Sequence, residues 1–135
     1  MENLPSNLKY TKTHEWCKRI DSNTNQWLIG ITDHAQKLLG ELVYVELLEV
    51  DVTVKAGVEC VVVESVKAAA DVYAPFNGRI IEVNESLNSE PQAINESPYD
   101  NGWLFKIEIA SEDESPINDL LDNEAYQTLL DGGNC

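Results

Sequence analysis

The chain has 135 residues, of which 9 are lysine or arginine and 24 are aspartate or glutamate, so its formal net charge is -15. A charge of this sign is repelled by the phosphates of nucleic acids and by anionic membrane surfaces, which argues against both as partners. Residues 38–135 carry nearly all of the excess, so a protein that docks on that part is expected to present positive charge.

The length predicts one compact domain over residues 1–135, with a core of about residues 8–110 and a C-terminal helical segment of about residues 115–131. Cys17, Cys60 and Cys135 are odd in number and widely spaced, which is not typical of a disulfide framework. The N-terminus has neither the apolar core of a signal peptide nor the arginines of a transit peptide. No apolar run approaches the roughly 18–20 residues that span a bilayer. We therefore expect a soluble, cytoplasmic protein.

The first predicted elements are a hairpin and a short helix. Residues 9–16 alternate like a half-buried strand, and residues 26–31 are suited to pair with them across a polar loop at residues 19–25. Thr32 can then accept a backbone hydrogen bond as a helix cap, and Gly40 tolerates the left-handed conformation that ends a helix. A helix of about two turns is expected between them.

Short β-rich segments follow, and the turn signals between them favour an antiparallel sandwich or barrel. The expected strands are residues 42–50, 60–66, 69–73, 79–83 and 102–110. Ser115 before Pro116, Asp122 as a second cap, and Gly132 as a stop predict C-terminal helices. The fold class is therefore mainly β, with a short internal helix and helices at the C-terminus.

One lysine, Lys67, lies where the segments 60–66 and 69–73 must reverse direction, at Ser65 to Ala68. A lysine at a hairpin tip is usually only solvated surface. A side chain that another enzyme modifies, however, must project from a narrow turn with small neighbours and a rigid sheet behind it. Lys67 is followed by three alanines and meets these conditions.

Four sequence blocks, the third of which contains Lys67, form a recognisable pattern by their order and spacing. They are "YTKTHEW", "GITDHAQKLLGELVYVEL", "VVVESVKAAADVYAPFNGRIIEVNESL" and "INESPYDNGWLFKI". Together they span most of residues 8–109 and closely resemble the H-protein family of the glycine cleavage system. Two positions depart from the pattern usual in that family. Val61 stands where glycine is common. Residues 48–51 stand where a Pro-x-x-Gly turn is common, and Asp51 takes the place of its glycine. Aspartate tolerates a turn conformation less freely than glycine does.

The resemblance implies a flattened β-barrel or sandwich hybrid of the lipoyl-domain type, and lipoate joined covalently to Lys67. It implies a carrier that is not itself an enzyme and that brings the aminomethyl group of glycine from glycine decarboxylase (P protein) to the tetrahydrofolate-dependent aminomethyltransferase (T protein). Dihydrolipoamide dehydrogenase (L protein) reoxidises the carrier, and a lipoate ligase or lipoyl transferase supplies the cofactor. By the same resemblance Glu64 is expected to help that ligase recognise the hairpin, and Thr13, Glu15 and Asp71 are candidates for protecting the loaded arm.

Other carriers are less compatible with the sequence. Biotin carriers typically have methionines beside the lysine, yet Met1 is the chain's only methionine, and lipoyl domains of 2-oxoacid dehydrogenases typically read Asp-Lys-Ala where this chain reads Val66-Lys67-Ala68. A lipoate relay that passes lipoyl groups to other enzymes stays open, because it would use the same lysine.

The histidines, cysteines and tryptophans offer a possible metal site and a possible aromatic wall for a ligand. His14, Cys17 and His34 do not follow the spacing of a structural zinc site, so we expect His14 to pack or form a hydrogen bond within its strand. The three tryptophans are expected in the core.

Overall fold

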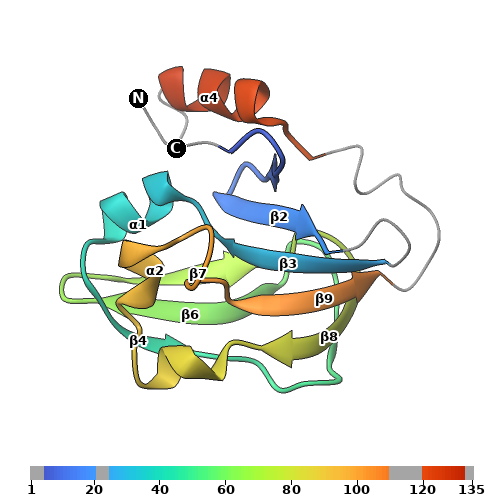
Figure 1. The fold of residues 1–135 in the computed structure, drawn as a ribbon, viewed down its shortest axis with the longest axis vertical. Helices are drawn as coiled ribbons and strands as arrows, with labels where there is room; N and C mark the ends of the chain where they lie inside the picture. The colour runs from blue at the N-terminus through green and yellow to red at the C-terminus, as the bar shows by residue number, and fades with distance from the viewer. Residues whose placement is uncertain (1–4, 21–24, 110–119, 133–135) are drawn as a thin grey trace.

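We describe the protein from a computed structural model, which places residues 5–20, 25–109 and 120–132. Two antiparallel sheets pack against each other as a sandwich, and they do not close into a barrel (Figure 1). The larger sheet has the strand order β1-β2-β3-β9-β8-β5, and the smaller has the order β4-β6-β7. The predicted mainly β sandwich is confirmed.

The elements have the following bounds. The strands are β1 (Lys9–Tyr10), β2 (Glu15–Arg19), β3 (Gln26–Ile31), β4 (Leu42–Glu46), β5 (Thr53–Val54), β6 (Glu59–Ser65), β7 (Ala69–Tyr73), β8 (Gly78–Val83) and β9 (Phe105–Ile109). The helices are α1 (Asp33–Leu39), the 3-10 helix η1 (Glu85–Asn88), α2 (Ala93–Glu96) and α4 (Asn123–Asp131). The second expected C-terminal helix, at Ser115 and Pro116, lies outside the described residues.

The prediction of one strand over residues 9–16 is wrong. Residues 9–10 form β1, the chain reverses at Thr11 to His14, and β2 then pairs antiparallel both with β1 and with β3. His14 has a φ of 74°, a left-handed conformation that turns the chain and that alternation in a sequence does not signal. The N–H of His14 donates to the carbonyl oxygen of Thr11 at 3.2 Å, which closes the reversal.

The helix caps agree with the prediction. The Thr32 hydroxyl accepts a hydrogen bond from the Ala35 N–H, and Gly40 ends α1 with a φ of 87°. The Asp122 carboxylate caps α4 by accepting from the Ala125 N–H at 2.7 Å. Asp51, at the unusual turn, adopts a φ of 72°, so aspartate takes a conformation there that favours glycine. η1 and α2 were not expected from the sequence.

The main core lies between the two sheets and includes Trp27 and Cys17. A second cluster lies under α4 and is built from Leu8, Tyr10, Trp16 and Tyr126. The rings of Tyr10 and Tyr126 are stacked with centroids 4.9 Å apart, which fixes α4 across β1 and β2 (Figure 1). Trp16 and Trp27 are buried, as expected for core tryptophans, and Trp103 is partly buried against the second cluster.

Candidate functional site

The tip of the β6–β7 hairpin is a turn closed by a serine hydroxyl. The N–H of Ser65 donates to the carbonyl oxygen of Ala68 at 2.7 Å, and the Ser65 Oγ accepts from the N–H groups of Lys67 and Ala68 at 3.2 and 3.0 Å. The predicted reversal at residues 65–68 is therefore confirmed. Because both strands of the hairpin are paired up to this turn, the lysine stands on a defined support.

Lys67 is exposed at this tip, between Val66, which is 69 % exposed, and Ala68. Within residues 5–20, 25–109 and 120–132 its ammonium group has no hydrogen-bond or ion-pair partner, and its alkyl chain lies over Gly40 at the end of α1. Amide formation at the Nζ atom would therefore break no existing interaction. The small neighbours and the projecting position fit an attachment point for lipoate.

A cleft of about 170 Å³ lies beside the hairpin. Its apolar walls come from α1, β3, β6 and β7, and include Leu38 and Leu39. Its polar residues are Thr13, His14, Glu15 and Asp71. The structure thus brings together the three residues that were expected to protect a loaded arm.

Glu15 is the buried polar group of this cleft, with 1 % of its surface exposed. Its carboxylate accepts hydrogen bonds from the hydroxyl groups of Thr11 at 2.6 Å and Thr13 at 2.5 Å, and from the N–H of Tyr73 at 3.3 Å. Burial raises the pKa of Glu15 above its ordinary value, and these hydrogen bonds partly offset that rise by stabilising the charged form. No positively charged side chain contributes to the shift, so the carboxylate holds its negative charge at a cost.

His14 lines the same cleft, and its Nδ1 forms a hydrogen bond of 2.5 Å with the hydroxyl of Tyr126 from α4. His14 packs and forms a hydrogen bond, as expected, but it lies in the turn before β2 and its partner is on α4, so the expectation of a contact within its strand is wrong. Its ring lies 5.0 Å from that of His34, and burial together with His34 lowers the pKa of His14. In the part of the chain that the structure describes, no group of three or more potential ligands could hold a metal ion.

Glu64 occupies a different place from the other predicted residues. It is exposed on β6, paired with Ala69 of β7 and Tyr44 of β4, and it does not line the cleft.

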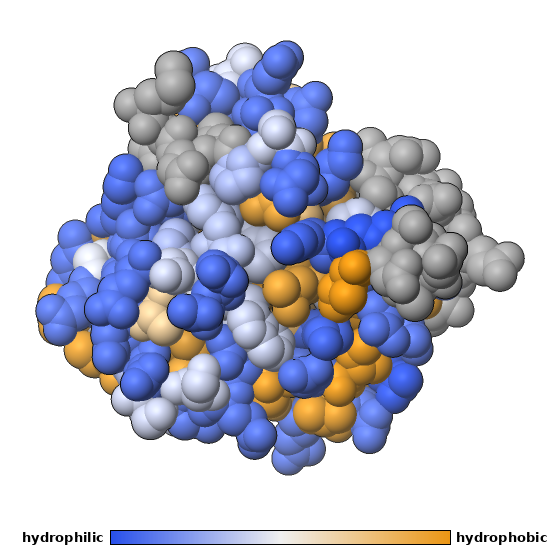
Figure 2. Space-filling model, in the orientation of Figure 1, coloured by the Kyte–Doolittle hydropathy of each residue, from blue (hydrophilic) through white to orange (hydrophobic). Residues whose placement is uncertain are grey.

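Hydrophobic surface also gathers near the hairpin tip, where Leu38, Val43, Tyr44 and Val66 are each at least half exposed. Figure 2 shows hydrophobic surface at the left edge, where the hairpin ends, and further hydrophobic patches in the centre and at the lower right of the same face.

Sequence reasoning missed two contributors to the cleft. Thr11 lies four residues before Glu15 and donates to it, a contact that the tight turn at Thr11 to His14 makes possible. Leu38 and Leu39 supply an apolar wall, and Leu38 is 55 % exposed. The sequence did contain a signal for this apolar wall, because two leucines end the predicted short helix immediately before Gly40.

Comparison with known proteins identifies the family. The model of the glycine cleavage H-protein family matches residues 8–132. The chain belongs to this family. Glycine cleavage system H proteins of Klebsiella pneumoniae subsp. pneumoniae and Escherichia coli O7:K1 are each 50% identical to it over 131 residues, which cover 97% of this chain and 98% of theirs. A crystal structure of a glycine cleavage system H protein from Mycobacterium marinum matches with a TM-score of 0.80 and 34% identity, over 96% of this chain and 99% of that one.

Members of the H-protein family are the lipoyl carriers of the glycine cleavage system, and they carry lipoate covalently on a lysine. They work with the P, T and L proteins and with lipoyl ligases. As a member of this family, the chain is a carrier subunit that is not itself catalytic. Among the described residues, no helix is long and apolar enough to cross a bilayer.

Proposed function

We propose that Lys67 carries the lipoyl group and that the loaded arm folds back into the cleft beside it, where Glu15 anchors the cargo. The observation that carries this proposal is the position of the cleft: its wall includes Ala70 and Asp71 of β7, the strand that begins two residues after Lys67. An arm attached at the hairpin tip therefore starts next to the cleft.

The chemistry of the cargo explains why a buried carboxylate would lie there. When bound, lipoate would supply a disulfide whose opening leaves the aminomethyl group on one sulfur atom and a thiol on the other, and transfer of that group would then leave the dithiol. The amine of that group is a cation, and a cation beside the Glu15 carboxylate would form a charge-assisted hydrogen bond. Glu15 has no cationic partner among the contacts that shift its pKa, so the cargo would provide the charge that it lacks.

The other residues of the cleft would limit the access of water. The apolar side chains of α1, β3, β6 and β7 cover most of it, and Thr13 holds the carboxylate by a hydrogen bond. Asp71 is exposed and lies at the cleft, where its negative charge would add to the attraction for a cation. Water exclusion strengthens such interactions and slows hydrolysis of a labile group.

Glu64 would act at an earlier stage, when the cofactor is attached. Its carboxylate is exposed three residues before Lys67, on the outer surface of the β4-β6-β7 sheet, where a ligase that binds the hairpin would contact it.

The chain as a whole would act as one cytoplasmic domain over residues 1–135, moving between the three partner enzymes.

The decisive experiment follows the loaded carrier in isolation. The parent, Glu15→Ala and Glu64→Ala proteins are lipoylated, loaded with the aminomethyl group, and followed by mass spectrometry as the group is lost. We expect Glu15→Ala to lose it roughly tenfold faster or more, which corresponds to losing one charge-assisted hydrogen bond. Glu64→Ala is the control, because that carboxylate lies outside the cleft, and it should match the parent. Equal rates for Glu15→Ala and parent would show that Glu15 does not protect the arm.

The lipoate relay is tested separately. Reconstitution with the P, T and L proteins measures glycine cleavage, and transfer of the lipoyl group from this chain to a second acceptor protein measures relay. We expect glycine cleavage to be supported.

A further inference from the structure

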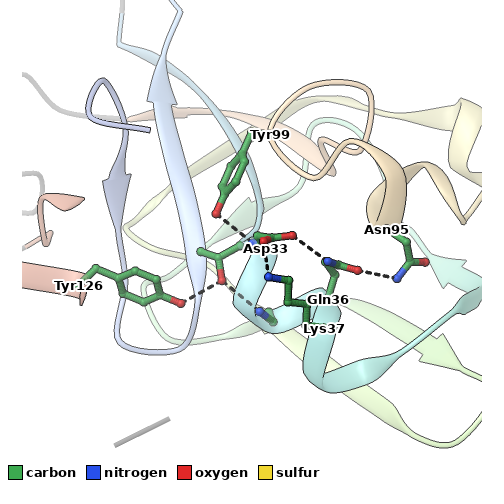
Figure 3. Close-up of polar contacts among 8 residues, drawn as sticks. Asp33, Gln36, Lys37, Asn95, Tyr99 and Tyr126 are labelled. Carbon is green, nitrogen blue, oxygen red and sulfur yellow. Dashed lines mark hydrogen bonds and ion pairs between the residues drawn. The ribbon is translucent and has the colours of Figure 1, made fainter. Parts of the chain in front are cut away.

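The block of residues 94–103 has no role in the carrier function described so far, yet it contacts both ends of α1, the helix that walls the cleft. Near the start of α1, the hydroxyl of Tyr99 accepts a hydrogen bond of 2.9 Å from the Asp33 N–H. Toward its end, the side chain of Asn95 bonds to Gln36 (Figure 3) and, beyond it, to the backbone of Gly40 and Leu42. The block therefore braces the helix beside the hairpin.

Asn95 makes three hydrogen bonds from one amide group, to Gln36 of α1, to Gly40 after its end and to Leu42 at the start of β4. Its Oδ1 accepts from the Leu42 N–H at 2.9 Å. Its Nδ2 donates to the carbonyl oxygen of Gly40 and to the Oε1 of Gln36, each at 2.9 Å. Three of the four hydrogen-bonding positions of an asparagine amide are thus used to hold one short segment.

The segment that Asn95 holds is also the segment that the lipoyl hairpin touches. Between Gly40 and Leu42, the carbonyl oxygen of Glu41 accepts a hydrogen bond of 3.1 Å from the N–H of Val66, the residue before Lys67. Leu42 pairs with Ser65 in the sheet. The tip of the hairpin is therefore tied to a piece of backbone whose own position depends on Asn95.

Gly40 adds a second contact with the lysine itself. A Cβ atom placed on Gly40 would lie 3.4 Å from the Cε of Lys67, so the alkyl chain of the lysine passes over this glycine. With a φ of 87° and a ψ of -162°, Gly40 adopts a conformation that is essentially restricted to glycine. Asn95 fixes the orientation of this peptide by binding its carbonyl oxygen.

α2, which carries Asn95, is itself held rigidly. A Cβ atom on Gly102 would lie 2.7 Å from the Cα of Ile94 and 2.8 Å from the carbonyl oxygen of Ser97, so the helix packs directly on the Gly102 backbone. The indole Nε1 of Trp16 donates to the carbonyl oxygen of Pro98 at 2.8 Å. Asn95 thus extends from a fixed support.

We propose that Asn95 is a positioning residue, which holds the Gly40–Leu42 backbone so that the arm on Lys67 leaves the hairpin on a path into the cleft. The inference rests on the proposed function, since it concerns the arm of that same lysine. Gln36, Lys37 and Gly40 border a second, polar pocket on the other side of α1 from Leu38 and Leu39. The alkyl chain of Lys67 lies over Gly40, which borders the polar pocket, and Ala70 and Asp71 of the strand after Lys67 border the cleft. A small displacement of Gly40 would therefore change which of the two the arm enters.

Asn84 offers a matched control. Its side chain also makes three hydrogen bonds, to the carbonyl oxygens of Asn101 and Trp103 and to the hydroxyl of Ser86. Asn84 is buried, whereas Asn95 is partly buried. None of these partners contacts the hairpin tip through a hydrogen bond recorded for the described residues. Asn84 reaches the hairpin only indirectly, through the Asn101 and Trp103 backbone on either side of Gly102. Asn84→Ala should therefore reduce global stability but change the position of Lys67 less than Asn95→Ala does.

The first measurement uses unlipoylated protein, so it does not depend on the cofactor. Amide hydrogen exchange at Val66 reports the bond to Glu41, and exchange at an exposed turn occurs through local opening. We expect Asn95→Ala to raise the exchange rate of Val66 roughly fivefold, as for the loss of about one net hydrogen bond, and Asn84→Ala to raise it clearly less. Equal exchange in the two variants would overturn the proposal.

The second measurement compares the lipoylated and loaded carriers. Asn95→Ala should be lipoylated at the parent rate but lose the aminomethyl group several-fold faster than Asn84→Ala. If Glu15→Ala accelerates the loss while Asn95→Ala does not, the positioning role is overturned and the proposed function stands. If the parent itself loses the group as fast as free loaded dihydrolipoamide, the proposed function fails, and the inference fails with it.

A second variant guards against loss of folding in Asn95→Ala. Asn95→Asp keeps the size of the side chain and an acceptor for Leu42, but it places a carboxylate oxygen against the carbonyl oxygen of Gly40. It should show the same pair of changes, faster exchange at Val66 and faster loss of the group. If Asn95→Asp behaved like the parent protein in both measurements, the proposal would be overturned.

Discussion

The backbone N–H of Tyr73 donates a hydrogen bond of 3.3 Å to the carboxylate of Glu15. This bond joins β7, the strand that follows Lys67, to β2 of the other sheet. The packing of the two sheets therefore determines where Glu15 lies relative to the hairpin, although Glu15 and Lys67 are 52 positions apart in the chain. The carboxylate and the attachment point are parts of one rigid arrangement, as a reproducible arm position requires.

Replacing Lys67 with arginine should abolish the carrier function and leave the fold intact. Arginine keeps the positive charge but has no amine that a ligase can acylate. Incubation with a lipoate ligase, followed by intact mass measurement and peptide mapping, should show one lipoyl group on the parent at Lys67 and none on Lys67→Arg. Lys55→Arg is the control, because Lys55 is likewise exposed but lies outside the hairpin tip. Modification of any other lysine in Lys67→Arg would contradict the assignment.

Replacing Glu64 with alanine should slow lipoylation with little effect on stability. The carboxylate is exposed and lies on the sheet that carries the hairpin, so its loss changes the surface and not the core. Exposed substitutions of this kind usually change the free energy of unfolding by less than about 0.5 kcal/mol. Glu46→Ala, on neighbouring β4, is the matched control and should be lipoylated at the parent rate. An unaltered initial rate for Glu64→Ala would remove Glu64 from ligase recognition.

The raised pKa of Glu15 has a defined effect on stability. Because burial makes the folded state hold this proton more tightly than the unfolded chain, the contribution of Glu15 is fully present below the pKa of an unfolded glutamate, about 4.3. It is lost as the pH rises through the raised pKa of the folded state. We expect the free energy of unfolding of the unlipoylated parent to fall relative to that of Glu15→Gln as the pH rises from about 4 to about 7. Urea denaturation at each pH measures this, and a constant difference would contradict it.

Replacing Tyr126 with phenylalanine should weaken the attachment of α4. The hydroxyl of Tyr126 bonds to the Nδ1 of His14 and, at 2.9 Å, to the Oγ1 of Thr32, and the tyrosine is fully buried. Its removal leaves buried polar atoms without this partner, at a cost of about 1–3 kcal/mol in the free energy of unfolding. Tyr44→Phe is the control, because Tyr44 is 51 % exposed, and it should be nearly neutral. A loss below about 0.5 kcal/mol for Tyr126→Phe would show that these bonds do not hold the helix.

Local patterns in the sequence determined much of the fold. The alternation in residues 69–73 predicts β7 to the residue, Thr32 and Gly40 bound α1, and Asp122 caps α4. The narrow turn at Ser65 to Ala68, with its small neighbours, identified Lys67 as the point of attachment to test. These features were readable because strand periodicity, caps and turn residues act over a few neighbouring positions.

Tertiary structure decided the rest, because it depends on contacts between distant parts of the chain. The left-handed backbone of His14 divides residues 9–16 into two strands and turns Glu15 inward, where the threonine hydroxyls and the N–H of Tyr73 surround it. Burial then raises its pKa, which no local pattern could signal. In the same way Asn95 became recognisable as a support of the hairpin only when α2 was placed beside the end of α1, since a hydrogen bond across 53 residues leaves no trace in periodicity.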